Sequence, residues 1–289
     1  YGEKSVLRLL NISDAMHDLD GLGFEKDILN RFEDMLIGGE GIILVSGPTG
    51  SGKTTTLYST LNKMDNPDVN IVTIEDPIEY DLDNINQAQV NRRSGVTFAS
   101  ALRAILRQDP DIIMVGEVRD EETVELAIRA ALTGHLVFST IHTNDSASGF
   151  TRLLNWGMEP FLITSTVKGI LSQRLVRKLC KECREKHMVE PSELIKFGLE
   201  VDEPIEFYKG VGCLSCRNTG YQGRVGLFEL IRMNNDIADL VMEQKPGHVI
   251  RQKAIEYGMF SLLHDGLIKA QRGETSLQEI VETLGTDTI

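Results

Sequence analysis

The first half of the chain alternates short apolar runs with amphipathic stretches. The apolar runs end in polar residues and occupy residues 42–46, 71–75, 112–116 and 136–141. Such runs are typical of strands buried on both faces, as in a parallel sheet covered by helices. Apolar side chains recur at helical spacing in residues 25–37, 97–108 and 123–132. Strands that alternate with helices predict an α/β fold built on a parallel sheet.

The pattern changes near residue 175, where a segment rich in glycine and charge begins. Helical spacing returns from residue 231 onward. Because the first residue is Tyr1 and not Met, we expect the chain to continue from a longer protein. We therefore expect the end of an N-terminal domain with a linker, an α/β core, a cysteine-bearing subdomain and a C-terminal helical region, at residues 1–20, 21–175, 176–230 and 231–289.

The composition is that of an ordinary globular protein, with 41% hydrophobic and 25% charged residues among 289. The longest apolar runs are far shorter than the about 20 residues that a membrane-spanning helix needs. The net charge is −13, so nucleic acid could bind only through a local basic patch, because neutralisation of phosphates drives such binding. The 4 cysteines are too few for a disulfide scaffold of this length.

A phosphate-binding motif, G-x-x-x-x-G-K-T, begins at Gly47. Its glycines let backbone N–H groups turn toward phosphate oxygens, and the following helix directs its positive end at the same anion. Lys53 can reach the β- and γ-phosphates, and the Thr54 hydroxyl can ligate Mg²⁺. A chance match is the alternative, but the motif follows an expected strand and opens an expected helix. We expect ATP to be bound by Gly47, Pro48, Thr49, Gly50, Ser51, Gly52, Lys53, Thr54 and Thr55.

Hydrolysis also needs a carboxylate, and two candidates follow expected strands. Parallel α/β sheets place their ligands at these strand ends. The first candidate is Glu117, for which a solvated strand-capping role is the alternative. The second is the cluster Glu75, Asp76 and Glu79, which could instead be a solvated turn. We expect both groups at the site, with Glu75 among the nucleotide-binding residues.

Histidine and arginine side chains complete the candidates. His142 ends an expected strand beside the phosphate-binding motif, where it could sense the γ-phosphate, whereas the role of His135 at the start of that strand stays open. An arginine that reaches a neighbour's transferred phosphate can be worth 10³–10⁵ in rate. The arginines of this region are Arg103, Arg107, Arg119 and Arg152, and most arginines are simply solvated or paired.

All four cysteines form two C-x-x-C pairs: Cys180, Cys183, Cys213 and Cys216. Two such pairs fit a tetrahedral Zn²⁺ site, and the long interval between them predicts an inserted subdomain. Redox pairs or plain thiols are the alternatives. Four thiolates leave no open position for a substrate, so we expect a structural zinc site.

Together these motifs resemble the secretion ATPase superfamily, and most closely the ATPases of type II secretion and type IV pilus assembly. Residues 74–79 look like the Asp box of this family, and residues 106–117 are similar to its Walker B segment. Residues 134–144 look like its His box, and residues 220–226 resemble its turn after the cysteines. The resemblance covers most of the chain.

The resemblance implies a RecA-like core and a homo-hexameric motor at the cytoplasmic face of the bacterial inner membrane. Such motors use ATP hydrolysis to move an inner-membrane platform protein that adds pilin or pseudopilin subunits. Glu117 would position Mg²⁺ through water, Glu79 would act as the general base and His142 would sense the γ-phosphate. Arg8 would reach the ATP of a neighbouring subunit. The cysteine pairs resemble the assembly and secretion branch.

Three other functions remain as alternatives. A nucleic-acid translocase on the same core is disfavoured by the net charge of −13 and by the lack of an aromatic and basic stripe. A nucleotide-gated adaptor would not need Glu117 and Glu79. A zinc-only interaction module would leave the first 175 residues unexplained.

Overall fold

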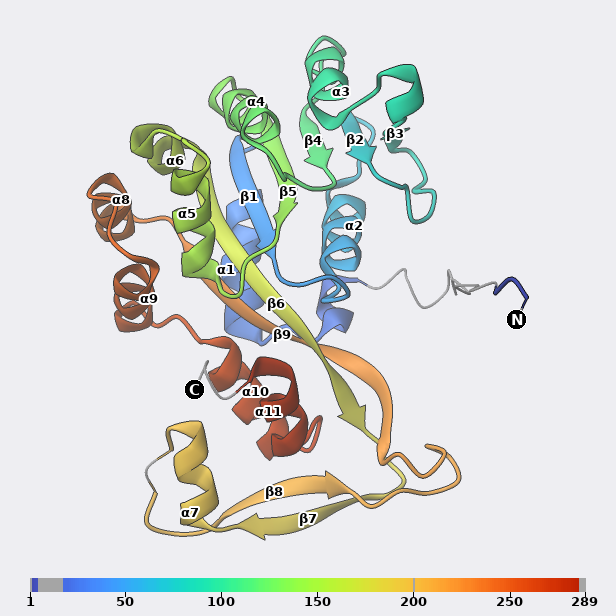
Figure 1. Cartoon of the computed structure of the whole chain (residues 1–289), viewed down its shortest axis with the longest axis vertical. Coiled ribbons are helices and arrows are strands. Elements are labelled where there is room, and N and C mark those ends of the chain that lie inside the picture. The colour runs from blue at the N-terminus through green and yellow to red at the C-terminus, as the bar shows by residue number, and fades with distance from the viewer. Residues whose placement is uncertain (1, 5–17, 200, 286–289) are drawn as a thin grey trace.

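The computed structural model describes residues 2–4, 18–199 and 201–285. Its centre is a seven-stranded sheet in the order β3-β2-β4-β5-β1-β6-β9 (Figure 1). The first six strands are mutually parallel and β9 is antiparallel to β6. The strands are β1 (Gly41–Ser46), β2 (Ile71–Glu75), β3 (Asn86–Gln89), β4 (Ile112–Val115), β5 (Leu136–Ile141), β6 (Val167–Leu179) and β9 (Tyr221–Arg232). The predicted α/β fold on a mostly parallel sheet is confirmed.

Helices cover both faces of this sheet. Successive strand residues point to opposite sides, so each central strand contributes to a core on either face. Ile42 and Leu44 join one core, and Ile43 and Val45 join the other. The second core packs against α1 (Lys26–Leu36), α2 (Lys53–Met64) and the short helix η2 (Leu19–Leu22). The first core packs against α3 (Phe98–Ile105), α4 (Glu121–Leu132), α5 (Ser146–Asn155), α6 (Pro160–Thr166), α8 (Asn235–Met242) and α9 (Gly247–Glu256).

Short polar side chains fix where the helices of the first core begin. Thr97 and Ser100 form a reciprocal capping box at α3. Asp120 accepts from the Thr123 N–H at α4, and Asp145 accepts from the Ser148 N–H at α5. Such caps satisfy backbone N–H groups that lack a partner in the first turn. The ends of α4 and α5 beside the sheet are therefore set locally by the sequence.

The strands β6 and β9 extend far beyond the rest of the sheet (Figure 1). They run continuously through residues 175 and 230, at which we divided the chain, and carry the cysteine pairs at their distal end. A hairpin of β7 (Arg184–Val189) and β8 (Ile205–Gly210) follows, with α7 (Pro191–Leu194) and η4 (Ile195–Phe197) between its strands. It shares a small core with α10 (Leu262–Gln271) and α11 (Leu277–Leu284), the expected C-terminal helices.

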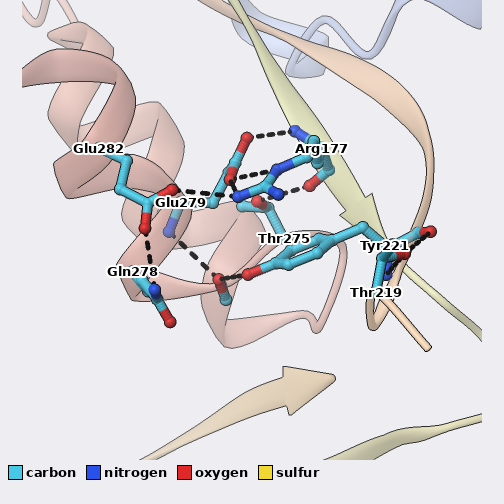
Figure 2. Close-up of polar contacts among 8 residues, drawn as sticks. Arg177, Thr219, Tyr221, Thr275, Gln278, Glu279 and Glu282 are labelled. Atoms are coloured by element: carbon cyan, nitrogen blue, oxygen red, sulfur yellow. Dashed lines mark hydrogen bonds and ion pairs between the residues drawn. The ribbon is translucent and has the colours of Figure 1, made fainter. Parts of the chain in front are cut away.

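A polar cluster fastens α11 to the extended part of β6 (Figure 2). The Arg177 backbone N–H donates to Glu279 Oε1 at 2.9 Å, and Arg177 Nε donates to Glu279 Oε2 at 2.7 Å. The Arg177 guanidinium also lies 4.2 Å from the ring centroid of Tyr221 on β9. The Tyr221 hydroxyl is 2.7 Å from Ser276 Oγ at the start of α11. Two strands and one helix are thereby joined beside the cysteines.

Most elements that the apolar pattern predicted are present within a few residues of the expected ends. The strands β3, β6, β7, β8 and β9 were not predicted from the pattern, nor were α5, α6, α7, η2, η3 (Arg92–Ser94) and η4. Among the residues that the structure describes, no helix combines the length and apolar character needed to cross a membrane.

Candidate nucleotide-binding site

The phosphate-binding motif forms the turn between β1 and α2. Gly47 follows the last residue of β1, and Gly52 occupies the N-cap position of α2 with φ of 90°. Gly47 has φ of 146°, and a Cβ atom there would lie 2.5 Å from Ser51 Oγ and 2.6 Å from Gln173 O. Only glycine fits this position, because both the backbone angle and the space exclude a side chain. The loop therefore has the close backbone turn that a phosphate cradle requires.

The Lys53 side chain folds back over this loop. Its ammonium group donates to Gly47 O at 2.8 Å and to Pro48 O at 2.9 Å. Burial lowers the pKa of Lys53 to about 8, although the nearby Glu117 carboxylate opposes this change and Arg174 adds to it. Glu117 and Arg174 therefore both lie close enough to influence the charge of the lysine. Thr54 and Thr55 follow in the first turn of α2 and are partly exposed.

The phosphate-binding loop is supported by a residue that was not predicted from the sequence. Gln173 on β6 is 1% exposed. Its Nε2 donates to Ser51 O at 2.7 Å, and its Oε1 accepts from Thr56 Oγ1 at 2.9 Å. The available signal was the polar pair Gln173-Arg174, which lies between the apolar pairs Ile170-Leu171 and Leu175-Val176. Gln173 thus fixes both sides of the turn that carries Lys53.

Glu117 and His142 meet where β4 and β5 end side by side. Thr140 Oγ1 donates to Gly116 O at 2.8 Å, which fastens the two strand ends together. Beyond them, His142 Nε2 lies 3.7 Å from Glu117 Oε2. Arg119 Nε lies 2.5 Å from the same oxygen. The structure therefore brings Lys53, Glu117 and His142 to one edge of the sheet.

Glu75 ends β2 in a separate hydrogen-bonded group. Its side chain is buried and accepts from the Tyr58 hydroxyl, from Thr73 Oγ1 at 2.7 Å and from Gln87 Nε2 at 3.0 Å. Burial, followed by the contact with Glu75, raises the pKa of Tyr58 far above its ordinary value. Burial and the same carboxylate raise the pKa of Tyr80 to about 12. The Glu75 oxygens are held by these side chains, so its expected contact with nucleotide stays a prediction.

The remaining acids lie in the turn after β2. The peptide bond between Asp76 and Pro77 is cis, and Asp76 Oδ2 lies 3.6 Å from Arg92 Nη2. Glu79 is half-buried, and its backbone hydrogen bonds to the Tyr58 hydroxyl. That bond connects the turn to the group around Glu75. The role of Glu79 as general base also stays a prediction.

Three of the other candidate side chains have structural partners. His135 Nδ1 lies 2.9 Å from Ala130 O at the end of α4, on the opposite edge of the sheet from His142. Arg103 pairs with Glu122 at 2.6 Å, and the Arg152 guanidinium lies 4.6 Å from the Trp156 ring centroid. Arg107 is exposed after α3. Arg8 lies outside the described residues.

The four cysteines come together at the distal end of β6 and β9. Their sulfur atoms all lie within 4.8 Å of one another. Three of the Sγ–Sγ distances are 3.7–3.8 Å, which matches the edge of about 3.8 Å that Zn–S bonds of about 2.3 Å give in a tetrahedron. No other group of three or more such ligands occurs in the part of the chain that the structure describes. These residues therefore fit a Zn²⁺ ion.

The electrostatics of the cluster favour one thiolate over several. Burial alone raises the pKa of Cys216, but the Cys213 and Gly220 N–H groups, each 3.2 Å from its sulfur, lower it to about 6. Burial and the neighbouring thiols raise the pKa of Cys183 to about 12. Metal binding requires deprotonated sulfur ligands. A divalent cation supplies the positive charge that would stabilise the remaining thiolates.

Comparisons with known proteins extend this geometry. The family model described as "Type II/IV secretion system protein" matches residues 1–282. The chain is 47% identical to the type IV pilus assembly ATPase PilB of Thermus thermophilus, covering 97% of this chain and 32% of that protein. It is 45% identical to the type II secretion system ATPase E of Vibrio cholerae, covering 97% of this chain and 56% of that protein. The chain thus spans about a third to a half of these relatives.

A solved structure has the same fold. The pilus retraction motor PilT with bound ADP superposes with a TM-score of 0.68 at 31% sequence identity. The superposition covers 92% of this chain and 66% of that one.

Proposed function

This chain belongs to the family of type II/IV secretion system proteins, and on that premise we propose that it hydrolyses ATP to drive assembly of a type IV pilus or a secretion pseudopilus. The observation that carries the proposal is the meeting of Lys53, Glu117 and His142 at one edge of the sheet. Its relatives PilB and ATPase E are named for such systems. The expected reaction converts ATP and water to ADP and phosphate.

Each side chain has a role that follows from its place. The N–H groups of the loop from Gly47 and the first turn of α2 would hold the phosphates. Lys53 would exchange its bonds to Gly47 O and Pro48 O for the β- and γ-phosphates. The Thr54 hydroxyl would ligate Mg²⁺, which neutralises phosphate charge in such sites.

The acids and the histidine would act at the γ-phosphate. Glu117 would position Mg²⁺ through water, and His142, on the same carboxylate, would sense the γ-phosphate. Glu79 would accept the proton of the attacking water, and Glu75 would support the nucleotide site from β2. The tetracysteine cluster would hold Zn²⁺ as a structural element at the base of the hairpin of β7 and β8, which we call the distal hairpin.

We further propose that the working form is a homo-hexamer on the cytoplasmic side of a bacterial inner membrane. There it would act on a membrane-embedded platform protein and would not bind nucleic acid. Arg8 and the exposed Arg103 and Arg107 are candidates to reach the ATP of a neighbouring subunit. A site completed by a neighbour hydrolyses slowly in isolated subunits, so activity should depend on assembly.

Turnover of Mg-ATP per subunit, measured across a range of protein concentrations, tests the proposal. Specific activity is expected to rise steeply with concentration, together with a sixfold mass in sizing experiments. Lys53→Ala should abolish turnover. Activity that is unchanged in Lys53→Ala would contradict the proposal, and nucleotide binding without turnover in any assembly state would favour an adaptor. Salt-sensitive stimulation by DNA would favour a translocase.

A further inference from the structure

Arg174, beside the loop-supporting Gln173 on β6, has no role in the chemistry described above. We propose that Arg174 is a positioning residue that holds the loop of His142 against the phosphate-binding loop. The preference of the site for a triphosphate over a diphosphate would then depend on Arg174. This inference rests on the proposed function, because it assigns a further residue to the same nucleotide site.

The contacts of Arg174 are made to two backbone carbonyl groups. Arg174 Nη2 donates to Asn144 O at 2.8 Å, and Nη1 donates to Gln173 O at 3.1 Å. Asn144 stands two residues after His142, in the short loop between β5 and α5. A charged donor to a carbonyl makes one of the stronger hydrogen bonds in proteins. The guanidinium therefore joins the β5–α5 loop to β6.

The far end of this loop is fastened by a different set of contacts. Ser146, the first residue of α5, donates its N–H to Glu229 Oε1 at 2.9 Å and its hydroxyl to Glu229 O at 2.9 Å. Glu229 lies on β9 and is fully buried. At the other end, His142 Nε2 lies 3.7 Å from Glu117 Oε2. The bond from Arg174 to Asn144 thus constrains the middle of the loop, two residues from both His142 and Ser146.

The neighbouring charges favour a fixed guanidinium. Arg174 is half-buried, and burial lowers its pKa, while Glu229 and Asp145 oppose that change. The two carboxylates therefore favour the charged form of Arg174 against the effect of burial. Arg174 in turn affects the pKa of Lys53. Its charge thus influences the phosphate-binding loop, although both of these hydrogen bonds go to backbone carbonyl groups.

Two adjacent residues of β6 consequently hold two different loops. Gln173 supports the phosphate-binding loop through Ser51 O. Arg174 points to the other face of the strand and supports the His142 loop through Asn144 O. A displacement of either loop would therefore act on the same strand, β6. The distance between Lys53 and His142 would therefore be set by this dipeptide, and that distance decides whether a γ-phosphate can be contacted from both sides.

The test compares the affinities of the full chain for Mg-ADP and for Mg-ATPγS, a slowly hydrolysed triphosphate. The ratio of dissociation constants, Kd for Mg-ADP divided by Kd for Mg-ATPγS, measures recognition of the γ-phosphate without requiring turnover. Arg174→Ala is expected to lower this ratio about tenfold, the size of one hydrogen bond from a charged donor. Its affinity for Mg-ADP should stay within about twofold of the unmodified chain.

A double-mutant cycle separates positioning from a general structural effect. His142→Ala should lower the same ratio, and Arg174→Ala combined with His142→Ala should lower it no further, because both act through one group. Arg232→Ala is the matched control. Arg232 lies at the far end of β9 and pairs with Asp34 at 3.7 Å, so its loss should leave the ratio unchanged.

Three results would overturn the inference. An unchanged ratio in Arg174→Ala would show that the loop does not depend on this residue. Equal weakening of both nucleotides would make Arg174 a direct ligand of the α- or β-phosphate or a support of the whole site. Additive effects in the double variant would separate Arg174 from His142. If the unmodified chain binds neither nucleotide, the proposed function itself fails together with the inference.

Arg174→Lys covers the case in which the alanine variant does not fold. Lysine keeps the charge but cannot donate to two carbonyl groups as a planar fork. The ratio should then fall about threefold, between the unmodified chain and His142→Ala. A ratio equal to that of the unmodified chain would contradict the proposed role of the two bonds.

Discussion

The Lys53 ammonium group donates a hydrogen bond to the carbonyl oxygen of Gly47 at 2.8 Å, so the phosphate-binding loop is closed on itself by its own lysine. A second bond goes to Pro48 O at 2.9 Å. Burial lowers the pKa of this lysine to about 8. Nucleotide binding would replace the two neutral carbonyl acceptors by phosphate oxygens. The charge state of Lys53 should therefore differ between the free and bound protein near pH 8.

We predict that affinity for Mg-ADP falls as the pH rises above about 8. In the free protein Lys53 loses its proton there, whereas an adjacent phosphate raises the pKa of the bound lysine. Binding above this pH must therefore take up a proton, and the affinity should fall by at most about tenfold per pH unit. Dissociation constants measured between pH 7 and 9.5 check this.

Lys53→Arg supplies the control for the pH effect. Arginine stays charged throughout this range, so whatever affinity the variant retains should be independent of pH. A flat profile in the unmodified chain would contradict the depressed pKa of Lys53.

Glu117→Gln should abolish most turnover while nucleotide binding is retained. The substitution keeps the shape of the side chain but removes the charge that Arg119 contacts at 2.5 Å and His142 approaches at 3.7 Å. Because misplacement of the reacting groups by about 1 Å can cost about 100-fold, we expect a loss of that size or more in rate without the carboxylate that would position Mg²⁺. Single-turnover hydrolysis and Mg-ADP binding, measured together, separate the two effects.

The matched variant is Glu125→Gln. Glu125 pairs with Arg129 at 2.7 Å on the exposed surface, where an ion pair contributes only about 0–1 kcal/mol. Its turnover should equal that of the unmodified chain. A similar loss in both variants would remove the special role of Glu117.

The placement of these groups at the sheet edge could be predicted because each group closely follows a strand in the sequence. Glu117 follows β4, His142 follows β5 and the motif of Lys53 follows β1. Parallel pairing then brings these ends together. The same motifs indicated the family, and the comparisons confirm it.

The support for this site could not be predicted, because it depends on long-range pairing. Gln173 contacts Ser51, which is 122 residues away in the sequence. The strands missed from the pattern also lack a continuous apolar run: β3 (Asn86–Gln89) is NQAQ, and β9 (Tyr221–Arg232) is buried only from its fifth residue to its eleventh. Their pairing with neighbouring strands, and not their own hydropathy, makes them part of the sheet.

Cys180→Ser should remove bound zinc and destabilise the distal hairpin. The Cys180 and Cys213 sulfurs lie 3.8 Å apart, so loss of one ligand opens the tetrahedron. Structural zinc can contribute about 10 kcal/mol to the folding of small domains. Metal content per chain should fall from one to none, while Mg-ADP affinity is retained. Ser215→Ala, between Cys213 and Cys216, is the control, and unchanged zinc in Cys180→Ser would make the ligand assignment wrong.

Glu279→Gln should loosen α11 from β6 without affecting the nucleotide site. Glu279 is 5% exposed and accepts from both the backbone and the side chain of Arg177, at 2.9 and 2.7 Å (Figure 2). The glutamine can accept one of these bonds but brings an N–H₂ group against a donor. We expect the free energy of unfolding to fall by about 2 kcal/mol, the size of a hydrogen bond to a charged group.

Glu282→Gln separates the buried contact from simple charge attraction. Glu282 reaches the same guanidinium at 3.0 Å, but its side chain is 50% exposed. Water and salt screen such a contact, so its loss should cost about 0.5 kcal/mol. Urea unfolding of the two variants measures the difference, and Mg-ADP affinity should be unchanged in both. Equal destabilisation would mean that Arg177 holds α11 by charge alone, and that the buried bonds to Glu279 contribute nothing further.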